Sequence, residues 1–292
     1  MTSLRAVMAG SRATPQLEDY TGYMLRLAHA RAHQIATEAF PDGPHPREYA
    51  VLTAVAAGPL SQQRLAERLH VNRTLMVAVA DTLERRGLVE RRRDPADRRS
   101  YALHVTPAGH TELERLHGEI ERVDRRMTEK LDDAERERLN ELLRKLALVD
   151  LALVPAPLAD RTGFLLTRAH FASRERADEL LRPLGIAIRH FGMLMLLAAH
   201  GPSSQQALAR RFFVSPTMIT QMVDEVEARG LAERRPNPGD RRSYLVTLTP
   251  EGKRKLVAAR RLVTRLADEI AAPIGADGDR ELRALLRKLV GI

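Results

Sequence analysis

Residues 91–101 read RRRDPADRRSY, and residues 234–244, 143 positions later, read RRPNPGDRRSY. In both copies an Arg-rich segment leads into a Pro-containing turn and then into Asp-Arg-Arg-Ser-Tyr. The flanking residues are largely apolar or β-branched, which is typical of short strands, so each copy is predicted to form a β-hairpin. The Arg residues at its tip could reach a groove lined with phosphates.

The duplication extends well beyond the hairpin. Without gaps, residues 60–110 and 203–253 are identical at 25 of 51 positions, and Thr21–Leu25 aligns with Thr162–Leu166. A repeat of this length indicates a duplicated domain and not a solenoid unit. We expect four segments: a flexible tail (1–15), a first domain (16–150), a linker (151–159) and a second domain (160–292).

Both repeats have the same predicted order of elements. In the first, apolar residues at helical spacing predict helices over residues 17–40, 47–57, 62–70 and 73–86, then the hairpin, then two more helices. Ser61 and Asn72 are expected to cap the third and fourth helices, as Ser204 and Ser215 do in the second repeat. Thr106-Pro107 and Thr249-Pro250 open the long helices that follow the hairpins. The predicted fold class is mainly α with small β wings, in tandem winged helix-turn-helix domains with helical extensions.

The composition narrows the class of function. The net charge is +9 and the pI about 10.4, and 42 of the 47 basic residues are Arg. The planar guanidinium of Arg is better suited than the Lys ammonium to donate two hydrogen bonds at once to a phosphate or to the edge of guanine. The sequence has no Cys, which excludes disulfides and thiolate metal sites. No P-loop, GxGxxG, HExxH or nucleophile elbow is present, so we expect neither an enzyme nor a cofactor or metal. Without a signal peptide or an apolar run of transmembrane length, the protein is expected to be cytoplasmic.

The join between the repeats, VDLALVPAPLAD at residues 149–160, is not a flexible tether. Its two Pro residues stiffen the path, and four apolar side chains are expected to be buried. These are Leu151, Leu153, Val154 and Leu158. The join therefore predicts two domains in a fixed relation.

Two segments carry a resemblance to a known family: LSQQRLAERLHVNRTLMVAVADTLERRGLVERRRDPADRRSYALHVTPAGH (residues 60–110) and SSQQALARRFFVSPTMITQMVDEVEARGLAERRPNPGDRRSYLVTLTPEG (residues 203–252). The chain resembles, twice, the MarR family of bacterial transcription regulators. Members usually form homodimers through their terminal helices. The resemblance implies an intramolecular pseudo-dimer whose helical dimerisation extensions form one bundle; the alternative is that each repeat pairs with a second chain, giving four winged domains.

The resemblance implies a sequence-specific regulator that binds double-stranded DNA, most often a repressor, and releases it when a small aromatic or anionic ligand binds. The alternative is a ligand- or partner-binding protein of the same fold that has lost DNA binding. Intact Arg-bearing hairpins in both copies argue against that alternative.

The fourth helix of each repeat is expected to lie in the major groove, with the hairpin as the wing. The DNA-binding candidates are, in the first repeat, Ser61, Asn72, Arg73, Thr74, Val77, Ala78, Arg98 and Arg99, and in the second Ser204, Ser215, Thr217, Thr220, Gln221, Arg241 and Arg242. Ion pairs that fix the wing are expected at Asp97, Asp240, Asp81 and Asp224. Many members carry Arg where this chain has Ala78 and Gln221, and the two base-facing turns differ, so the operator is expected to have unlike half-sites.

The family's ligand lies between the dimer-forming helices and the winged core. An aromatic wall with an Arg or a His suits a phenol or a carboxylate. The candidates are Tyr23, Arg26, His29, His33 and Tyr49 in the first repeat, and Phe164, Arg168, His170, Phe171, Arg189, His190 and Phe191 in the second.

Overall fold

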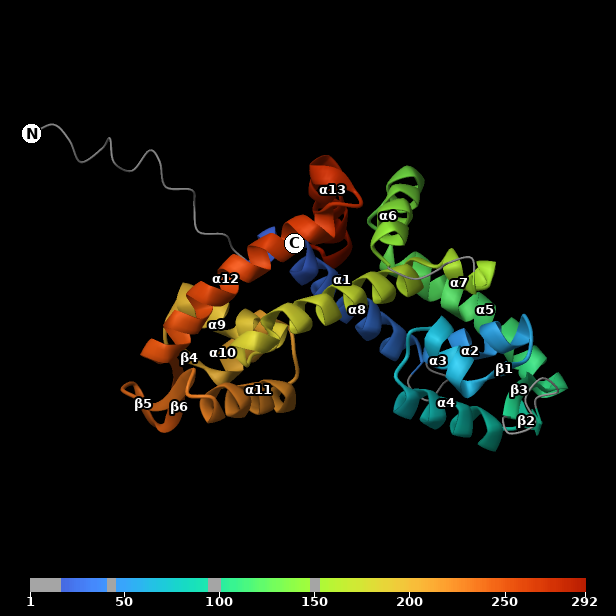
Figure 1. Ribbon diagram of the computed structural model, residues 1–292, viewed down its shortest axis with the longest axis horizontal. Coiled ribbons are helices and arrows are strands. Elements are labelled where there is room, and N and C mark those ends of the chain that lie inside the picture. The colour runs from blue at the N-terminus through green and yellow to red at the C-terminus, as the bar shows by residue number, and fades with distance from the viewer. Residues whose placement is uncertain (1–16, 41–45, 94–100, 148–152) are drawn as a thin grey trace, which may run out of the picture. The chain divides into compact units, whose positions relative to one another are not determined.

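The computed structural model describes residues 17–40, 46–93, 101–147 and 153–292, and of Asp240, Arg241 and Arg242 only the backbone (Figure 1). Within this part the chain forms two compact units. The larger unit joins residues 24–180 with 265–292, and the smaller unit joins the described residues up to Tyr23 with residues 181–264. The two units cut across the predicted domain limits, which stay a prediction.

The larger unit holds the first winged region and helices of both repeats. Its elements are α1 (Thr21–Ala39, from Met24), α2 (Pro46–Ala56), β1 (Leu60–Ser61), α3 (Gln62–Arg68), α4 (Arg73–Arg85), β2 (Val89–Arg93), β3 (Tyr101–Val105), α5 (Pro107–Met127), α6 (Asp133–Leu146), α7 (Ala156–Ala159), α8 (Thr162–Leu181, to Leu180), the end of α12 and α13 (Gly275–Val290).

The smaller unit holds the second winged region. Its elements are the 3-10 helix η2 (Leu17–Asp19), the 3-10 helix η4 (Arg182–Leu184), α9 (Ile188–His200), β4 (Ser203–Ser204), α10 (Gln205–Phe212), α11 (Pro216–Ala228), β5 (Ala232–Asn237), β6 (Asp240–Leu248) and α12 (Pro250–Ala271, to Thr264).

Each winged region contains one small antiparallel sheet. The strand orders are β1-β3-β2 and β4-β6-β5, so the strand that precedes α3 or α10 pairs with the returning strand of the hairpin. In the first sheet Val89 faces Val105 and Leu60 faces Leu103. The second hairpin has an irregular register at Pro236 and Asn237. The predicted hairpins and the mainly α fold with small wings are confirmed.

The core of the first winged region is apolar and includes part of the join between the repeats. Tyr49, Leu52, Leu65 and Leu83 are buried there, and Val154 and Leu158 pack with them. The predicted burial of Val154 and Leu158 is confirmed. The prediction for Leu153 was wrong: 52% of this residue is exposed, because only one side of the short segment meets the core. Leu151 lies outside the described residues.

Each winged region is completed by a segment of the other repeat. In the larger unit Phe164, near the start of the second repeat, packs against the first winged core beside Leu158 of the join. In the smaller unit Tyr20, from the first repeat, meets Phe191 of α9 edge-on, with ring centroids 6.2 Å apart. Each repeat therefore contributes apolar side chains to the other.

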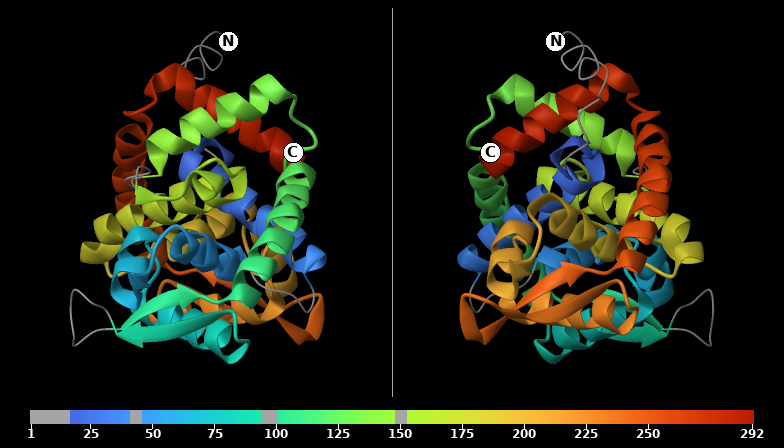
Figure 2. Two further views of the ribbon diagram at one scale, coloured as in Figure 1. Left: turned by 90° about the vertical axis from the view of Figure 1, so that its right-hand side faces the viewer. Right: turned by 90° about the vertical axis from the view of Figure 1, so that its left-hand side faces the viewer.

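The terminal helices α6 and α13 pack against each other within the larger unit (Figure 2). The Arg138 Nε lies 3.0 Å from a Glu281 carboxylate oxygen, and Lys288 pairs with Glu135. Arg138 and Glu281 are 143 positions apart, the spacing of the repeat, so matching positions of the two repeats meet here. The helical extensions of both repeats thus lie in one bundle, as an intramolecular pseudo-dimer requires.

Membrane-spanning length was tested on the described residues. None of their helices is by itself long and apolar enough to cross a membrane, although α8 and η4 together with α9 pass by length and composition as one broken span.

The Thr-Pro-x-Gly sequence after each wing has a steric role. The Thr106 hydroxyl donates to the Gly87 carbonyl at 2.7 Å and accepts from the Gly109 amide at 3.0 Å. This draws the first turn of α5 onto the backbone behind α4, where a Cβ on Gly109 would lie 2.0 Å from the Leu88 carbonyl oxygen. A Cβ added at Gly252 would likewise lie 1.9 Å from the Leu231 carbonyl oxygen. Both contacts are with backbone, which cannot move aside.

We therefore expect Gly109→Ala or Gly252→Ala to lower the free energy of unfolding by about 1–3 kcal/mol or more, as overpacking does. Gly118→Ala is the control, because Gly118 lies within α5 with nothing within 4 Å of the added Cβ. It should stabilise the protein by about 0.5–1 kcal/mol through helix propensity. Urea unfolding followed by circular dichroism measures all three; equal effects at Gly109 and Gly118 would contradict the steric account.

Candidate nucleic-acid interface

The first turns of α4 and α11 are built by side-chain caps. The Asn72 Oδ1 accepts from the Leu75 amide at 2.8 Å, and the Ser215 Oγ accepts from the Met218 amide at 3.2 Å. Ser61 and Ser204 cap α3 and α10 in the same way. These four side chains therefore hold the helix starts in place, and the predicted caps are confirmed.

Each of these helices buries one face and exposes the other. In α4 the residues Met76, Val79, Ala80 and Leu83 are buried. The exposed side carries the DNA-contact candidates, which are Arg73, Thr74, Val77 and Ala78 on α4 and Thr217, Thr220 and Gln221 on α11. Of these, the Thr220 hydroxyl also contacts Gln205, and Gln221 donates to Glu225.

Two exposed apolar side chains lie on the same surfaces. Val77 is 44% exposed and Met218 is 47% exposed. Apolar side chains at such positions can contact the methyl group of thymine. Met218 was not among the sequence candidates, because its apolar character matches that of a core residue.

Ion pairs that occur in both repeats join a wing strand to each of these helices. The guanidinium of Arg91 on β2 pairs with Asp81 and Glu84 of α4, and that of Arg234 on β5 pairs with Asp224 and Glu227 of α11. The wing-orienting role of Asp81 and Asp224 stays a prediction, and their partners are now placed. Glu84 and Glu227 were missed by the sequence analysis, although both copies keep them at the repeat spacing.

The tips of the wings lie partly outside the description. Asp97, Arg98 and Arg99 fall outside the described residues, as do the side chains of Asp240, Arg241 and Arg242. The described wing surface exposes Tyr101 and Tyr244, at 53% and 57%. These Tyr residues follow the repeated Asp-Arg-Arg-Ser sequence in both copies.

The effector candidates of the first repeat lie in different surroundings. Tyr49 is buried, and its hydroxyl is 3.1 Å from the His117 Nδ1, whose ring also contacts Arg161. His33 is exposed, and Tyr23 and Arg26 are partly buried on α1. His29 lies against helix α8 of the second repeat.

The effector candidates of the second repeat are equally dispersed. Phe164 packs on the first winged core, and Phe191 contacts Tyr20. Arg189 and His190 both bind Glu225 of α11, at 2.8 and 2.7 Å. These contacts hold the pKa of Glu225 down at about 2, with the Arg189 hydrogen bond as the largest cause. Arg168 donates to backbone carbonyls next to α3.

His29, His170 and Phe171 form a ring cluster in the larger unit. The two imidazoles stack with centroids 4.6 Å apart, and Phe171 lies 5.4 Å from His29 and 5.2 Å from His170. His29 and His170 occupy matching positions of α1 and α8. Burial is the main cause that lowers the pKa of His29 to about 4 and of His170 to about 3, and nearby Arg26, Arg47, Arg174 and His33 add to it.

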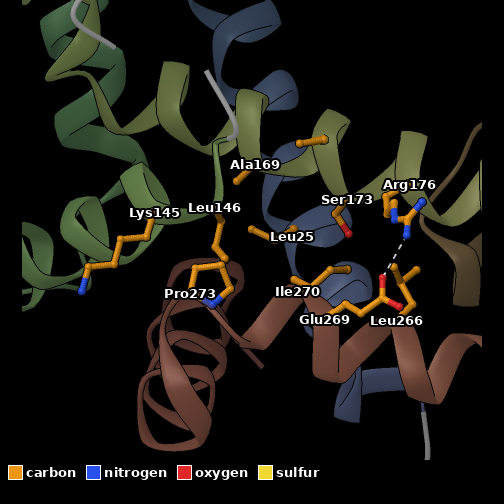
Figure 3. A pocket seen from close by; sticks show the side chains of 11 residues that line it. Leu25, Lys145, Leu146, Ala169, Ser173, Arg176, Leu266, Glu269, Ile270 and Pro273 are labelled. Atoms are coloured by element: carbon orange, nitrogen blue, oxygen red, sulfur yellow. Dashed lines mark hydrogen bonds and ion pairs between the residues drawn. The ribbon is translucent and has the colours of Figure 1, made fainter. Parts of the chain in front are cut away.

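One pocket of about 170 Å³ opens among α1, α6, α8 and the end of α12 in the larger unit (Figure 3). Its walls are mostly apolar, and the ion pair between Arg176 and Glu269 closes one side at 3.3 Å. The lining residues are Leu25, Lys145, Leu146, Ala169, Ala172, Ser173, Arg176, Leu266, Glu269, Ile270 and Pro273. The sequence-based effector candidates are not among them, and their roles stay predictions.

Two winged helix-turn-helix regions whose helical extensions pack together are the architecture of a transcription regulator with two DNA-binding domains. The profile of the MarR family matches residues 42–100 and 184–243. A Thauera aromatica protein named for transcriptional regulation of the hcr operon is 39% identical over 126 residues, covering 40% of this chain and 76% of that protein. The Mycobacterium tuberculosis HTH-type transcriptional repressor Rv2887 is 31% identical over 128 residues, covering 44% and 91%. The chain belongs to the MarR family of transcriptional regulators.

Solved structures similar to this chain match one repeat length. Wild-type MarR from E. coli in its apo form is 29% identical, covers 43% of this chain and 94% of its own, and has a TM-score of 0.39. The repressor CouR bound to a 23-mer DNA duplex is 30% identical, covers 45% and 93%, and has a TM-score of 0.43. CouR from Rhodococcus jostii bound to p-coumaroyl-CoA is 29% identical, covers 46% and 94%, and has a TM-score of 0.41.

The stacked histidines predict acid sensitivity. Their folded pKa values lie below the unfolded value of about 6.5, so between pH 4 and 6.5 the unfolded chain binds more protons. Stability should therefore rise with pH through this window and fall by on the order of a few kcal/mol as the pH drops from 6.5 to 4.

His29→Phe with His170→Phe should flatten this dependence, because the pair can no longer take up protons on unfolding. His110→Gln, at an exposed position on α5, is the control. Urea unfolding at a series of pH values measures the effect. A double variant as acid-sensitive as the parent protein would show that other groups cause the loss.

Proposed function

We propose that this protein is a sequence-specific transcriptional repressor that binds double-stranded DNA and is released from it by a small ligand. The observation that supports this most is the pairing, in both repeats, of an exposed helix start with a wing strand pinned to the same helix by an Arg (Arg91 or Arg234). Such a pair presents a helix to the major groove and a hairpin to the neighbouring backbone. The protein would act in the cytoplasm.

Three kinds of contact are assigned. Thr74, Thr217 and the amides at the starts of α4 and α11 would bind phosphate and set the register. Arg73, Val77 and Ala78, against Thr220 and Gln221, would face base edges. Arg98, Arg99, Arg241 and Arg242 would enter the minor groove from the wings.

The operator would have unlike half-sites. Arg73 offers a bidentate donor to guanine, whereas Pro216 stands at the matching position of the second repeat. The two exposed surfaces differ also at Val77 and Thr220. An imperfect palindrome fits this difference, with half-sites about one duplex turn (~34–36 Å) apart.

One chain would act as a pseudo-dimer, with domain limits at 16–150 and 160–292. The bundle of α6 and α13, which supplies the interface of a dimer, is formed within the chain. A homodimer with four winged domains is the competing arrangement, and light scattering of the free and DNA-bound protein separates the two by mass.

The ligand would occupy the pocket of Figure 3. Its volume of about 170 Å³ is close to the roughly 150 Å³ cavity that holds benzene, so a single-ring compound fits. The cationic Lys145 and Arg176 and the Ser173 hydroxyl suit a carboxylate or phenol on that ring. The apolar walls come from four helices of both repeats, so a ligand there would act on the bundle.

Neutralising the wings should weaken DNA binding. Arg98→Ala with Arg241→Ala should lower affinity at modest salt by at least tenfold and reduce the slope of log affinity against log salt by about 2, since about one counterion is released per contact. The probe is the DNA region upstream of its own gene, in a gel-shift titration at several salt concentrations.

The matched control is Arg125→Ala with Arg280→Ala, which removes two exposed Arg residues from α5 and α13. Unchanged affinity in the wing variant would remove the wings from the interface. If the unmodified protein does not bind this DNA, nor genomic fragments in a binding map, the alternative of a fold-sharing protein without DNA binding is favoured.

Filling the pocket should abolish the ligand response. Ala172→Phe places a ring in the space that the ligand would take, so DNA release by aromatic carboxylic acids such as benzoate should be lost while DNA binding is kept. Fluorescence anisotropy of labelled DNA against a panel of such acids measures it, with Ala198→Phe on α9 as a variant outside the pocket. A variant that responds like the parent would place the ligand elsewhere.

A further inference from the structure

Arg168 is a buried charged residue, with only 7% of its surface exposed. It lies on α8, the first helix of the second repeat, yet its Nη1 donates to the backbone carbonyls of Leu69 and His70, the latter at 3.0 Å. These carbonyls belong to the first repeat and lie in the turn between α3 and α4. All of these residues are in the larger unit.

The turn is tightly built. Leu69 ends α3, His70 adopts a left-handed backbone with φ of 47°, and the Val71 amide returns to the Ala66 carbonyl at 2.9 Å. Asn72 follows directly and caps α4. The orientation of the recognition helix α4 therefore depends on the backbone of four residues, two of which Arg168 binds.

A guanidinium suits this place physically. The carbonyl end of α3 carries partial negative charge, so a cation is stabilised there. Its hydrogen bonds to the two carbonyls are charge-assisted, although burial still lowers the pKa of Arg168. Glu175, seven residues further along α8, adds attraction at longer range.

The residue of the first repeat that matches Arg168 cannot donate the same hydrogen bonds. The position of α1 that matches Arg168 is Leu27, which has no polar atom in its side chain. At the matching turn of the second repeat, Phe213 also has a left-handed backbone, with φ of 54°, and is 57% exposed. The matching pair of residues, Leu27 and Phe213, therefore cannot repeat the guanidinium–carbonyl contact.

Helix α8 also faces the pocket of Figure 3. Ala169, Ala172 and Ser173 line it, one to five positions beyond Arg168. Because a helix moves as a rigid rod, a displacement of this wall would move the Arg168 side chain together with it.

We propose that Arg168 is a positioning residue that links the first recognition helix, α4, to helix α8 of the second repeat. When the helical bundle moves, α4 then moves with it, whereas the second recognition helix, α11, does not. The inference rests on the proposed DNA-binding function for its consequence, but the contact is testable without DNA. It assigns a different task to a side chain that the sequence offered as a ligand contact.

The test compares three variants of the full chain. Arg168→Leu installs the residue of the first repeat, Arg168→Lys keeps a donor, and Arg174→Leu removes an exposed Arg from the same helix as the control. Hydrogen–deuterium exchange of the free protein is followed at residues 69–76 and at the matching residues 212–219.

In Arg168→Leu, exchange at residues 69–76 should rise at least tenfold and exchange at 212–219 should not change. Arg168→Lys should show a smaller rise, and Arg174→Leu none. If Arg168→Leu does not fold, the lysine variant decides the same question. Unchanged exchange at 69–76, or an equal rise in both turns, would overturn the proposal.

Hydroxyl-radical footprinting on the DNA upstream of the gene gives the second readout. Arg168→Leu should weaken protection of one half-site by at least fivefold and leave the other as it is. Equal weakening of both half-sites would contradict the one-sided link. If the unmodified protein protects no DNA, the proposed function fails, while the exchange result still decides whether Arg168 holds the turn.

Discussion

Each repeat of this chain packs an apolar side chain against the winged core of the other. Phe164 of the second repeat packs against the first winged core, and Tyr20 of the first repeat packs on Phe191 in the second. Removing such side chains from water is the main favourable contribution to folding, so the two repeats stabilise each other. Two separate molecules would obtain a comparable contact only by association, which depends on concentration. Here it depends only on the chain being intact.

The two copies make different contacts at matching positions. Asp124 of α5 accepts hydrogen bonds from the Thr162 and Gly163 amides at 2.9 and 3.0 Å and so caps α8, whereas the matching residue of α12 is Ala267. The pKa of Asp124 is raised by burial, against the lowering effect of these amides. His190 contacts Glu225 of α11, whereas the residue of α4 that matches Glu225 is Thr82, which has no carboxylate. By contrast, each copy keeps a histidine at the matching positions His29 and His170, which stack on each other.

Much of the fold was accessible from sequence because the duplication gave each element two independent copies. The caps Ser61, Asn72, Ser204 and Ser215 and both hairpins were predicted correctly, since caps and turns depend on residues within a few positions of one another. Leu153 was placed wrongly because burial depends on which side of a short segment meets the core.

The candidate ligand residues show where local reasoning ends. Arg168, His190 and Tyr49 have a composition that suits a pocket, yet each is bound to a partner 99, 35 and 68 positions away. Spacing in the sequence does not reveal such partners. The pocket itself is lined chiefly by Ala, Leu and Ile, which no sequence pattern distinguishes from ordinary core residues.

The ion pair between Arg138 and Glu281 has an evolutionary consequence. In an assembly of two identical subunits, a side chain beside the symmetry axis faces its own copy, so a charge there meets the same charge. Once both subunits are encoded together, each position can mutate alone, and opposite charges can face each other. The salt bridge that now joins α6 to α13 is accessible only to a molecule that has given up symmetry.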